Sequence, residues 1–414
     1  HQQSGRLSWA TVLEPAIGLA QEGYPMTPLQ YKQLGWCLPK LVRSPSGARF
    51  FLQNDKPIPV GETFRQPELA KCLMRIARLG TDDFYRGEIA RGIHADMQEQ
   101  GGLITLEDLS EVHPVQREPL HAVFDGYDLL TTPPPAGGFL VLLGLKILEQ
   151  VHRDVDSLEL VDWYAVLGDT LHAVFAVRES LSTRLDQLKL AELESLLQER
   201  AREVGQAIEK GTYSPRLGSD GEEAGETTHL CTIDGEGMVV SLTQSLQSLY
   251  GSKTACTKYG FLFNNYLVTC PREPHPHQLG SRCQPRSNSA PSVLLPLGGS
   301  SQELITFGAA GSRRSVCAVL HTLSGLLDRG LSLQEAVALP RIHVRQSRRV
   351  WLEAFERAEA VSRHIAPRFQ EIEMRQRFSY AMGCLQAIRR TATGRFEGAA
   401  DPRREGTVEE VQSP

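Results

Sequence analysis

The chain has 414 residues, of which 41% are hydrophobic and 22% charged, and its 44 basic and 49 acidic residues give a formal net charge of −5. These fractions indicate a folded globular protein, and the length predicts two or three domains or one large α/β unit. The charge balance excludes the sequence-wide basic field of a nucleic-acid-binding protein, and the longest apolar run, 137–145, is far shorter than the ~20 residues of a membrane helix.

The first half of the chain has the pattern of helices. A capping signal begins at Thr105, and the rigid, proline-rich stretch 131–138 leads into an apolar helix predicted over 139–149. The segment 158–181 keeps apolar residues three or four positions apart, as a helix with one buried face does, and 188–208 repeats this pattern with more charge. We therefore expect helices to dominate this half.

The pattern changes to strands after residue 211. The segment 213–226 is polar, rich in glycine and without periodicity, which predicts an exposed, mobile loop. A glycine-rich turn, 308–311, leads into a helix predicted over 313–327. Between these segments the sequence predicts two antiparallel hairpins with glycines at the turns: 230–234 with 238–245, and 292–296 with 303–307. The order of helices, loop, strands and helices predicts a layered α/β fold with antiparallel sheet.

The cysteines and histidines give no sign of a metal or cofactor site. Eight cysteines are scattered without a Cys-x-x-Cys pair, which predicts separate thiols, although one or two bridges among Cys256, Cys270 and Cys283 stay open. His275 and His277 flank a proline without a third ligand nearby, so a polar loop is their expected setting. We therefore expect neither a metal nor a cofactor.

Thr227 lies where the polar loop gives way to the first strand, in a Thr-Thr-His sequence. Cleavage of the Glu226–Thr227 bond would give Thr227 a free α-amine beside its own hydroxyl, and such an amine titrates near ~7.7–8.0, low enough for a general base. One residue would then supply nucleophile and base, and the same hydroxyl would attack the preceding carbonyl to cleave the chain. By itself the tripeptide fits an ordinary strand start as well.

Further motifs, spread over nearly the whole chain, resemble the gamma-glutamyltransferase (glutathione hydrolase) family in order and spacing. They are found at 5–9, 14–17, 66–70, 84–87, 101–109, 133–138, 227–229, 250–251, 262–265, 285–291, 308–311, 383–388 and 398–404. The resemblance implies an N-terminal-nucleophile hydrolase fold, an αββα sandwich, whose precursor cleaves itself before Thr227. It divides the chain into a large-subunit part, 1–226, and a small-subunit part, 227–414, which associate as one interleaved domain.

The resemblance also implies roles for individual residues. Ser245 corresponds to the family's threonine that polarises the nucleophile, although an ordinary strand hydroxyl is the alternative. Gly311 and Ser312 correspond to a glycine pair whose backbone N–H groups hold the oxyanion of the tetrahedral intermediate. The positions that bind the amino-acid end of the γ-glutamyl group correspond to four residues: Gln247, Tyr266, Ser287 and Asn288.

Two features depart from the family pattern. Thr269 stands where the family has the aspartate that pairs with the substrate ammonium, and losing such a charge-assisted bond of ~1.5–3 kcal/mol weakens binding roughly tenfold to over a hundredfold. The family's carboxylate-binding arginine falls in a segment ahead of His1. Candidates to replace it are Arg286, Arg313 and Arg314, and the alternative for each of them is an ordinary surface charge. The sequence therefore supports hydrolytic chemistry better than γ-glutamyl specificity.

Three functions remain in competition. The first is a self-processing N-terminal-threonine hydrolase or acyltransferase that cleaves γ-glutamyl compounds such as glutathione and transfers the γ-glutamyl group to water, an amino acid or a peptide. The second is an acylase-like amide hydrolase with a different acyl group, and the third is a non-catalytic relative that serves as a binding protein. We expect a small-molecule substrate, no nucleic acid and, by analogy with the family, an extracytoplasmic location.

Overall fold

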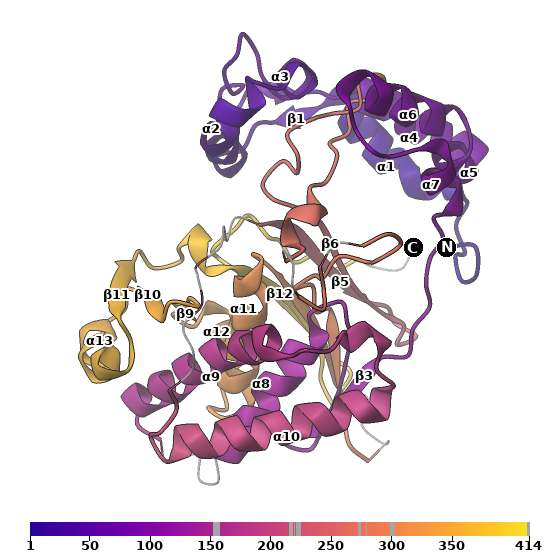
Figure 1. Ribbon diagram of the computed structural model, residues 1–414. Coiled ribbons are helices and arrows are strands. Elements are labelled where there is room, and N and C mark those ends of the chain that lie inside the picture. The colour runs from indigo at the N-terminus through magenta and orange to yellow at the C-terminus, as the bar shows by residue number, and fades with distance from the viewer. Residues whose placement is uncertain are drawn as a thin grey trace. The chain divides into compact units, whose positions relative to one another are not determined.

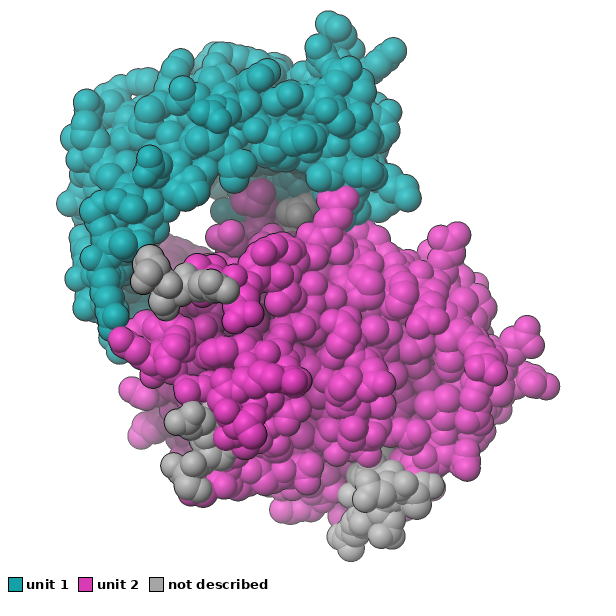
Figure 2. All heavy atoms as spheres, turned by 180° about the vertical axis from the view of Figure 1, so that it is seen from behind, with its two compact units in different colours: residues 1–116, 248–265 teal, residues 117–247, 266–414 magenta. Residues whose placement is uncertain are grey.

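The computed structural model of the protein describes residues 1–151, 158–214, 218, 220, 225–271, 275–278, 280–298 and 303–411, with the backbone alone at Glu226. The chain forms two compact units (Figure 1), unit 1 of residues 1–116 and 248–265 and unit 2 of residues 117–247 and 266–414, coloured separately in Figure 2. Each unit takes residues from both sides of the Glu226–Thr227 bond. The predicted division into 1–226 and 227–414 therefore does not coincide with the boundary between the two compact units. It refers to cleavage of one peptide bond, and it stays a prediction.

Unit 1 is mainly helical. Its helices are α1 (Trp9–Glu22), α2 (Pro28–Leu41), α3 (Pro45–Phe51), α4 (Pro67–Leu79), α5 (Asp82–Tyr85), α6 (Glu88–Gln100) and α7 (Leu106–Glu111). Three of them begin with a proline, whose fixed φ suits the first turn of a helix. The capping signal at Thr105 is confirmed, because Thr105 and Asp108 each accept the other's backbone N–H at the start of α7.

The later segment of unit 1, 248–265, packs against its helices. The backbone N–H of Thr257 donates to Asp96 Oδ2 on α6 over 2.8 Å, and Cys256 and Tyr259 lie in the same hydrophobic cluster as Ile89. Two short strands, β1 (Tyr24–Pro25) and β2 (Thr63–Phe64), form an antiparallel pair. In the sequence, β1 lies between α1 and α2, and β2 lies between α3 and α4.

Unit 2 is built on a six-stranded antiparallel sheet of order β13–β12–β8–β7–β4–β3. Its strands are β3 (Leu120–Phe124), β4 (Tyr127–Thr131), β7 (Ser292–Pro296), β8 (Leu304–Ala310), β12 (Cys384–Arg390) and β13 (Phe396–Ala400). The predicted hairpin of 292–296 with 303–307 is confirmed as β7 and β8, which pair antiparallel. Every residue of β8 is buried, so this strand is covered on both faces.

Helices cover one face of this sheet, and a two-stranded ribbon covers the other. Phe307 and Ala309 of β8 belong to the core shared with the helices, whereas Gly308, which faces the opposite way, packs against the ring of His229. The ribbon pairs β5 (Glu226–Ile233) with β6 (Val239–Gln247), which confirms the first predicted hairpin. The helices on the sheet are α8 (Gly138–Val151), α11 (Arg313–Leu327) and α12 (Leu333–Ala338), and two further helices, α9 (Leu160–Ser180) and α10 (Leu190–Glu209), pack against α8 (Figure 1). The predicted layered α/β class is thereby confirmed.

A smaller three-stranded sheet completes unit 2. It consists of β9 (Ile342–Val344), β10 (Arg349–Glu353) and β11 (Glu371–Arg375), with β10 central, antiparallel to β9 and parallel to β11. The helix α13 (Ala358–Ile365) forms part of the β10–β11 crossover. Short 3₁₀ helices are found at η2 (Leu185–Gln187), η3 (Tyr266–Thr269), η4 (Ala366–Arg368) and η5 (Tyr380–Met382).

Among the described helices, α9 is long and apolar enough to cross a membrane by length and composition. However, 72% of its apolar window is buried inside the protein. Asp169, His172 and Arg178 are also buried along it, with hydrogen-bond partners from other segments. These features are typical of the core helix of a folded unit.

The predicted exposed loop, 213–226, lies partly outside the described residues, which exclude 215–217, 219 and 221–224. Where the structure describes it, Ser214 and Gly218 are exposed as predicted, whereas Tyr213 and Asp220 are half-buried and Gly225 is buried, so the prediction of an exposed loop is wrong at those three positions. All eight cysteines lie in the described part of the chain, and none is in a disulfide, as the scattered spacing predicts.

Candidate active site

Thr227 lies near the start of β5, directly opposite Ser245 of β6. The ladder has an irregularity at this point, because Glu226 pairs with Gln247 whereas Thr227 pairs with Ser245. The two hydroxyl oxygens, Thr227 Oγ1 and Ser245 Oγ, are 3.0 Å apart, within hydrogen-bond distance. The structure therefore brings together the two hydroxyls that the sequence singles out.

The Ser245 hydroxyl is held from the other side by the end of β6. The backbone N–H of Gln247 donates to Ser245 Oγ over 3.0 Å. Gln247 adopts a positive φ of 76°, uncommon for a residue with a side chain, at the point where β6 ends. The backbone of Gln247 thus orients Ser245, while the predicted role of the Gln247 side chain in substrate binding stays a prediction.

His229 lies on the same face of β5 as Thr227, two residues further along. Its Nδ1 is 2.9 Å from Thr243 Oγ1, and its ring packs on Gly308, where a Cβ would come within 2.4 Å of the ring. Burial lowers the pKa of His229 to about 4, so the imidazole is neutral at pH 7. The histidine of the Thr-Thr-His sequence is therefore a packing residue between β5 and β8.

The turn between β8 and α11 contains the predicted oxyanion residues. Gly311 has a φ of 131° and a Cβ there would lie 2.9 Å from Gly383 Cα, so only glycine fits. Ser312 also has a positive φ, of 60°, a conformation that costs a residue with a side chain of order 1–3 kcal/mol and is found at functional sites. A Cβ on Gly225 would lie 2.8 Å from the backbone N of Ser312, so the chain ahead of Thr227 passes directly over this amide.

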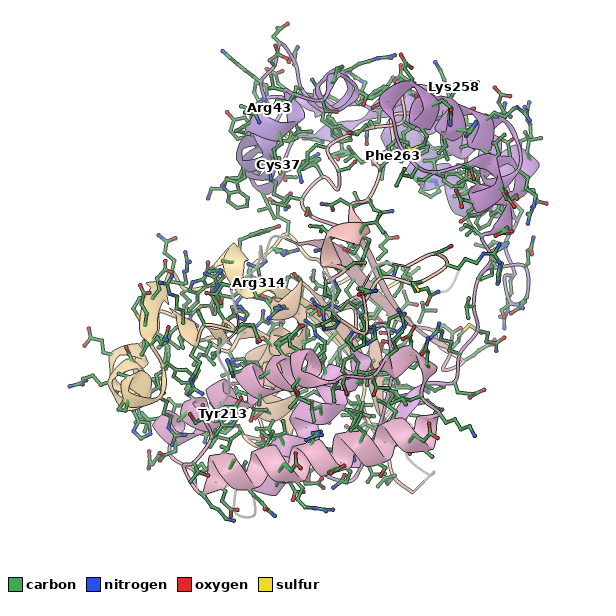
Figure 3. All side chains as sticks on the ribbon, in the orientation of Figure 1. Cys37, Arg43, Tyr213, Lys258, Phe263 and Arg314 are labelled. Carbon is green, nitrogen blue, oxygen red and sulfur yellow. The ribbon has the colours of Figure 1, made fainter. Side chains whose placement is uncertain are left out.

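Arg314 supports this turn from within the protein. The Arg314 side chain is labelled in Figure 3. Its Nε donates to the carbonyl oxygen of Gly311 over 2.9 Å, and its guanidinium lies 6.0 Å from the ring centroid of Trp351. The residue is buried, which rules out the surface-charge alternative for Arg314. The Arg314 guanidinium, in the first turn of α11, thus donates an N–H to Gly311 and fixes the shape of the turn between β8 and α11.

The predicted substrate-binding residues form a second group. Tyr266 Oη is 3.3 Å from Ser287 Oγ, and Ser287 N–H donates to the carbonyl of Pro135 over 2.9 Å. The Thr269 hydroxyl lies 2.8 Å from the carbonyl oxygen of Tyr266 and 3.0 Å from that of Arg286, so its hydrogen bonds are made with the backbone. Thr269, the predicted counterpart of the family's aspartate, thus fixes a loop and carries no charge.

Ser315 joins this group to the turn beside Thr227. Its Oγ lies 2.6 Å from the carbonyl oxygen of Ser312 and 3.2 Å from that of Asn288. The backbone of Asn288 is also in contact with Gly137, where a Cβ would lie 2.7 Å away, which explains the glycine after the proline-rich stretch. The predicted nucleophile, the glycine turn and the predicted substrate positions therefore belong to one site within unit 2.

Three arginines surround one carboxylate next to Asn288. Arg178 Nη1 donates to Asn288 Oδ1 over 2.8 Å, and its Nη2 lies 3.0 Å from Glu179 Oε1. Arg286 Nη1 is 3.1 Å from Glu179 Oε2 and Arg313 Nη2 is 3.6 Å from Oε1. Although burial raises the pKa of Glu179, the three guanidinium groups lower it to about 2. The arginine cluster, Arg178, Arg286 and Arg313 with Glu179, thus has three positive charges and one negative charge.

Sequence analysis missed Arg178, Glu179 and Ser315. Arg178 follows Phe175 by one helical turn, on the apolar face of α9, and an arginine at a position that should be buried is a usable signal. Arg286 and Arg313 were predicted as candidates to replace the family's carboxylate-binding arginine, with an ordinary surface charge as the alternative. Both are largely buried against Glu179.

The two histidines of the His275-Pro-His277 sequence face carboxylates. His275 Nε2 lies 3.7 Å from Glu179 Oε2, and His277 Nδ1 lies 3.9 Å from Asp186 Oδ1. Within the part of the chain that the structure describes, no three potential metal ligands of the His, Cys, Asp or Glu type come together.

Comparison with known proteins identifies relatives over the whole chain. The family model described as gamma-glutamyltranspeptidase matches residues 1–411. The glutathione hydrolase proenzyme of Bacillus subtilis (strain 168) is 27% identical over 431 residues, and the acylase ACY 1 proenzyme of Pseudomonas sp. (strain SE83) is 31% identical over 416 residues. These matches cover 98% and 97% of this chain and 71% of each relative.

A solved structure is similar over the full length. The crystal structure of cephalosporin acylase from Bacillus halodurans has a TM-score of 0.84 and 26% sequence identity, and the match covers 100% of this chain and 76% of that one. The sequence and structural relatives thus include both glutathione hydrolases and acylases.

Proposed function

The chain belongs to the gamma-glutamyltranspeptidase family, and on this premise we propose that it is a self-processing N-terminal-threonine hydrolase and acyltransferase. It cleaves itself at the Glu226–Thr227 bond, and the two fragments stay associated. It then cleaves γ-glutamyl compounds such as glutathione and transfers the γ-glutamyl group to water, an amino acid or a peptide. The observation that carries this proposal is the 3.0 Å distance between Thr227 Oγ1 and Ser245 Oγ, beside the Gly311–Ser312 turn.

Self-cleavage is an acyl shift followed by hydrolysis. Thr227 Oγ attacks the carbonyl carbon of Glu226 and releases its proton, with the Ser245 hydroxyl placed to relay it. The C–N bond breaks, and the nitrogen takes the proton and becomes the free α-amine of Thr227. Water then hydrolyses the Glu226 ester to a carboxylate and restores the Thr227 hydroxyl.

The same atoms perform turnover of substrate. The α-amine of Thr227, whose pKa is ordinarily ~7.7–8.0, accepts the hydroxyl proton as Oγ attacks the γ-carbonyl of the substrate. Backbone N–H groups of the Gly311–Ser312 turn stabilise the oxyanion, an effect that is worth roughly 10²–10³ in kcat per donor in related chemistry. The leaving amine takes the proton, and water or an acceptor amine then releases the acyl group from Thr227.

The test is a Thr227→Ala variant with Thr228→Ala as its matched control. Thr228 carries the same hydroxyl one position later and is exposed, on the opposite face of β5. We expect wild type and Thr228→Ala to yield a fragment beginning at Thr227, seen by denaturing gel and N-terminal sequencing, and Thr227→Ala to remain one chain. Cleavage of Thr227→Ala at the same bond would place the nucleophile elsewhere.

A second candidate function is supported by the arginine cluster. A γ-glutamyl group carries both a carboxylate and an ammonium, and the uncharged Thr269 gives that ammonium no partner. Three guanidinium groups around one carboxylate favour an anionic acyl group instead. These observations favour an acylase-like hydrolase for an acyl chain that ends in a carboxylate and lacks the ammonium.

Two matched substrates separate the candidates, because γ-glutamyl anilide and glutaryl anilide differ only in the α-ammonium group. A higher kcat/KM for the γ-glutamyl compound supports the first function, and a higher value for the glutaryl compound supports the second. A wild-type chain that stays uncleaved and hydrolyses neither compound would support the non-catalytic alternative and contradict both.

A further inference from the structure

The segment ahead of Thr227 contacts the turn of residues 345–348, which joins β9 to β10 in unit 2. The contacts come from three described residues of this segment: Tyr213, Gly218 and Asp220. Because they lie on the N-terminal side of the Glu226–Thr227 bond, they hold the part of the chain that supplies the carbonyl in self-cleavage.

Asp220 makes the most polar of these contacts. Its Oδ1 accepts the backbone N–H of Ser347 over 2.9 Å, and its Oδ2 accepts the Ser347 hydroxyl. Arg345 Nε lies 3.5 Å from the same Oδ2. The Asp220 side chain is only 14% exposed, so these charge-assisted contacts are partly shielded from water.

Gly218 places the backbone of the segment directly on the turn. Its N–H donates to the carbonyl oxygen of Gln346 over 3.1 Å. A Cβ on Gly218 would lie 3.1 Å from Gln346 Cβ, closer than nine in ten such contacts in proteins. A glycine therefore allows this close approach.

Tyr213 is held between α9 and the same turn. His172 Nε2 lies 3.3 Å from the carbonyl of Gln346, and its Nδ1 lies 2.9 Å from the Tyr213 hydroxyl. Because burial lowers the pKa of His172 to about 4, the ring is neutral at pH 7. Its one N–H donates from Nε2 to the carbonyl, so Nδ1 accepts a hydrogen bond from the Tyr213 hydroxyl.

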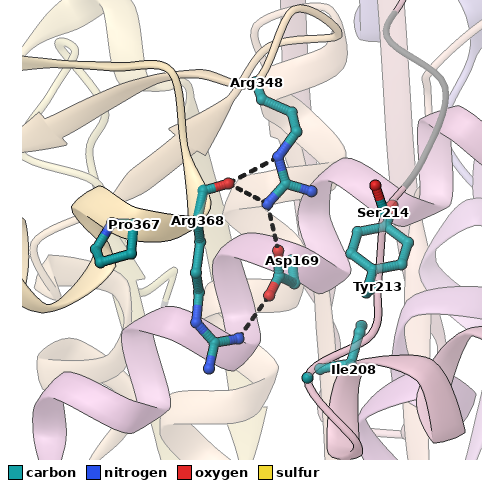
Figure 4. A pocket seen from close by; sticks show the side chains of 8 residues that line it. Asp169, Ile208, Tyr213, Ser214, Arg348, Pro367 and Arg368 are labelled. Atoms are coloured by element: carbon teal, nitrogen blue, oxygen red, sulfur yellow. Dashed lines mark hydrogen bonds and ion pairs between the residues drawn. The ribbon is translucent and has the colours of Figure 1, made fainter.

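Arg348 covers the ring of Tyr213 and is itself fixed. Its guanidinium carbon is 5.6 Å from the ring centroid. Its Nη2 donates to Asp169 Oδ1 over 3.0 Å and its Nε donates to the carbonyl oxygen of Arg368 over 2.9 Å, while Arg368 also pairs with Asp169 (Figure 4). These contacts surround a cavity of about 460 Å³, and they make the turn a rigid support for Tyr213.

We propose that the 345–348 turn is a clamp for the uncleaved chain, and that Asp220 is a positioning residue for self-cleavage. The clamp holds the segment at Tyr213, Gly218 and Asp220, and Gly225 then passes over the Ser312 amide, next to the bond that Thr227 attacks. Fixing both sides of the bond reduces the orientational freedom that the attack must otherwise overcome. This proposal rests on the proposed self-cleavage of the Glu226–Thr227 bond.

The test measures the rate of self-cleavage of the full chain. Wild type, Asp220→Ala, Ser347→Ala, the double variant and the control Glu209→Ala are purified uncleaved, and appearance of the fragment that begins at Thr227 is followed over time. Glu209 is an exposed acid at the end of α10, and Glu209→Ala removes the same charge as Asp220→Ala. We expect at least about a tenfold slower cleavage for Asp220→Ala, a smaller slowing for Ser347→Ala, and no further slowing when the two are combined, because they share one contact.

Once processed, Asp220→Ala should have the kcat/KM of wild type, since the clamp acts before the bond is cut. Wild-type cleavage rates in both single variants, or fully additive slowing, would overturn the clamp. So would an equal loss of rate in Glu209→Ala, or a loss of kcat/KM in the processed variants. A wild-type chain that never yields the Thr227 fragment would instead contradict the proposed function.

Discussion

Two clusters of charge in unit 2 have opposite properties, because one is fully buried and the other is partly exposed. In the first, the charge network, Arg341, Arg403, Asp401 and Glu353 balance two positive charges with two negative charges, and each side chain is at most 1% exposed. Arg341 Nη2 lies 2.6 Å from Asp401 Oδ2, Arg403 Nη1 lies 3.1 Å from Asp401 Oδ1, and Arg403 also pairs with Glu353. Backbone carbonyls, such as that of Leu339, accept further N–H groups of Arg403.

The arginine cluster at the site is unbalanced by comparison. Glu179 is shared among three arginines, and its side chain is 29% exposed. A buried charge costs free energy unless it is paired and hydrogen-bonded, so the balanced network suits a structural role. An excess of positive charge beside a nucleophile leaves binding capacity for an anionic ligand. The two clusters thus differ in charge balance as well as in burial, and this difference is the reason for proposing a binding role for the arginine cluster alone.

The largest expected effect is on stability, from breaking the charge network. Arg403→Gln leaves Glu353 and Asp401 with one guanidinium between them, and removal of one partner of a buried pair costs about 3–5 kcal/mol. We expect chemical denaturation to show this loss in the free energy of unfolding. Arg395→Gln, whose pair with Glu397 is largely exposed, should lose less than about 1 kcal/mol. Similar losses in both variants would contradict the structural role of the network.

An intermediate effect is expected from the pH dependence of the arginine cluster. The pKa of Glu179 falls from its ordinary 4.5 to about 2 in the folded chain. Its contribution to stability is therefore fully present above pH 4.5 and is lost as the pH falls toward about 2. At 1.36 kcal/mol per pKa unit this amounts to at most about 3 kcal/mol.

The measurement compares wild type with Glu179→Gln by urea unfolding at pH 7 and pH 3. The difference in the free energy of unfolding should be large at pH 7 and smaller at pH 3. Glu194→Gln, a change at an exposed position of α10, should give no such pH-dependent difference. A difference that is constant between the two pH values would contradict the pairing of Glu179 with the arginines.

The smallest effect on stability should accompany a clear effect on substrate binding. Of the three arginines, Arg313 makes the longest contact with Glu179, so Arg313→Gln should change the free energy of unfolding by less than about 1 kcal/mol. If the arginine cluster binds the carboxylate of the acyl group, KM for glutaryl anilide should rise roughly tenfold or more. Arg329→Gln, just beyond the end of α11, is the control and should leave KM unchanged. An unchanged KM in Arg313→Gln would remove that residue from the binding role.

Local patterns predicted much of the secondary structure. The periodicity of 158–181 and 188–208 corresponds to α9 and α10 within a few residues, and the helix predicted over 313–327 has the bounds of α11. These segments were readable because caps, glycine turns and the spacing of apolar residues act over a few positions. The polar composition of 213–226 predicted exposure only in part, because Asp220 and Gly218 form specific contacts with a distant turn that composition does not encode.

For the candidate site, the sequence by itself determined the reactive residue types: a threonine at a strand start, a serine on the next strand and a glycine turn before a helix. Only the tertiary structure decided that Thr227 and Ser245 meet at 3.0 Å and that Arg178, Arg286 and Arg313 converge on Glu179. The physical reason is distance along the chain. Hydrogen-bonded turns and strands depend on neighbouring residues, whereas the charge of a site depends on which remote side chains are buried together.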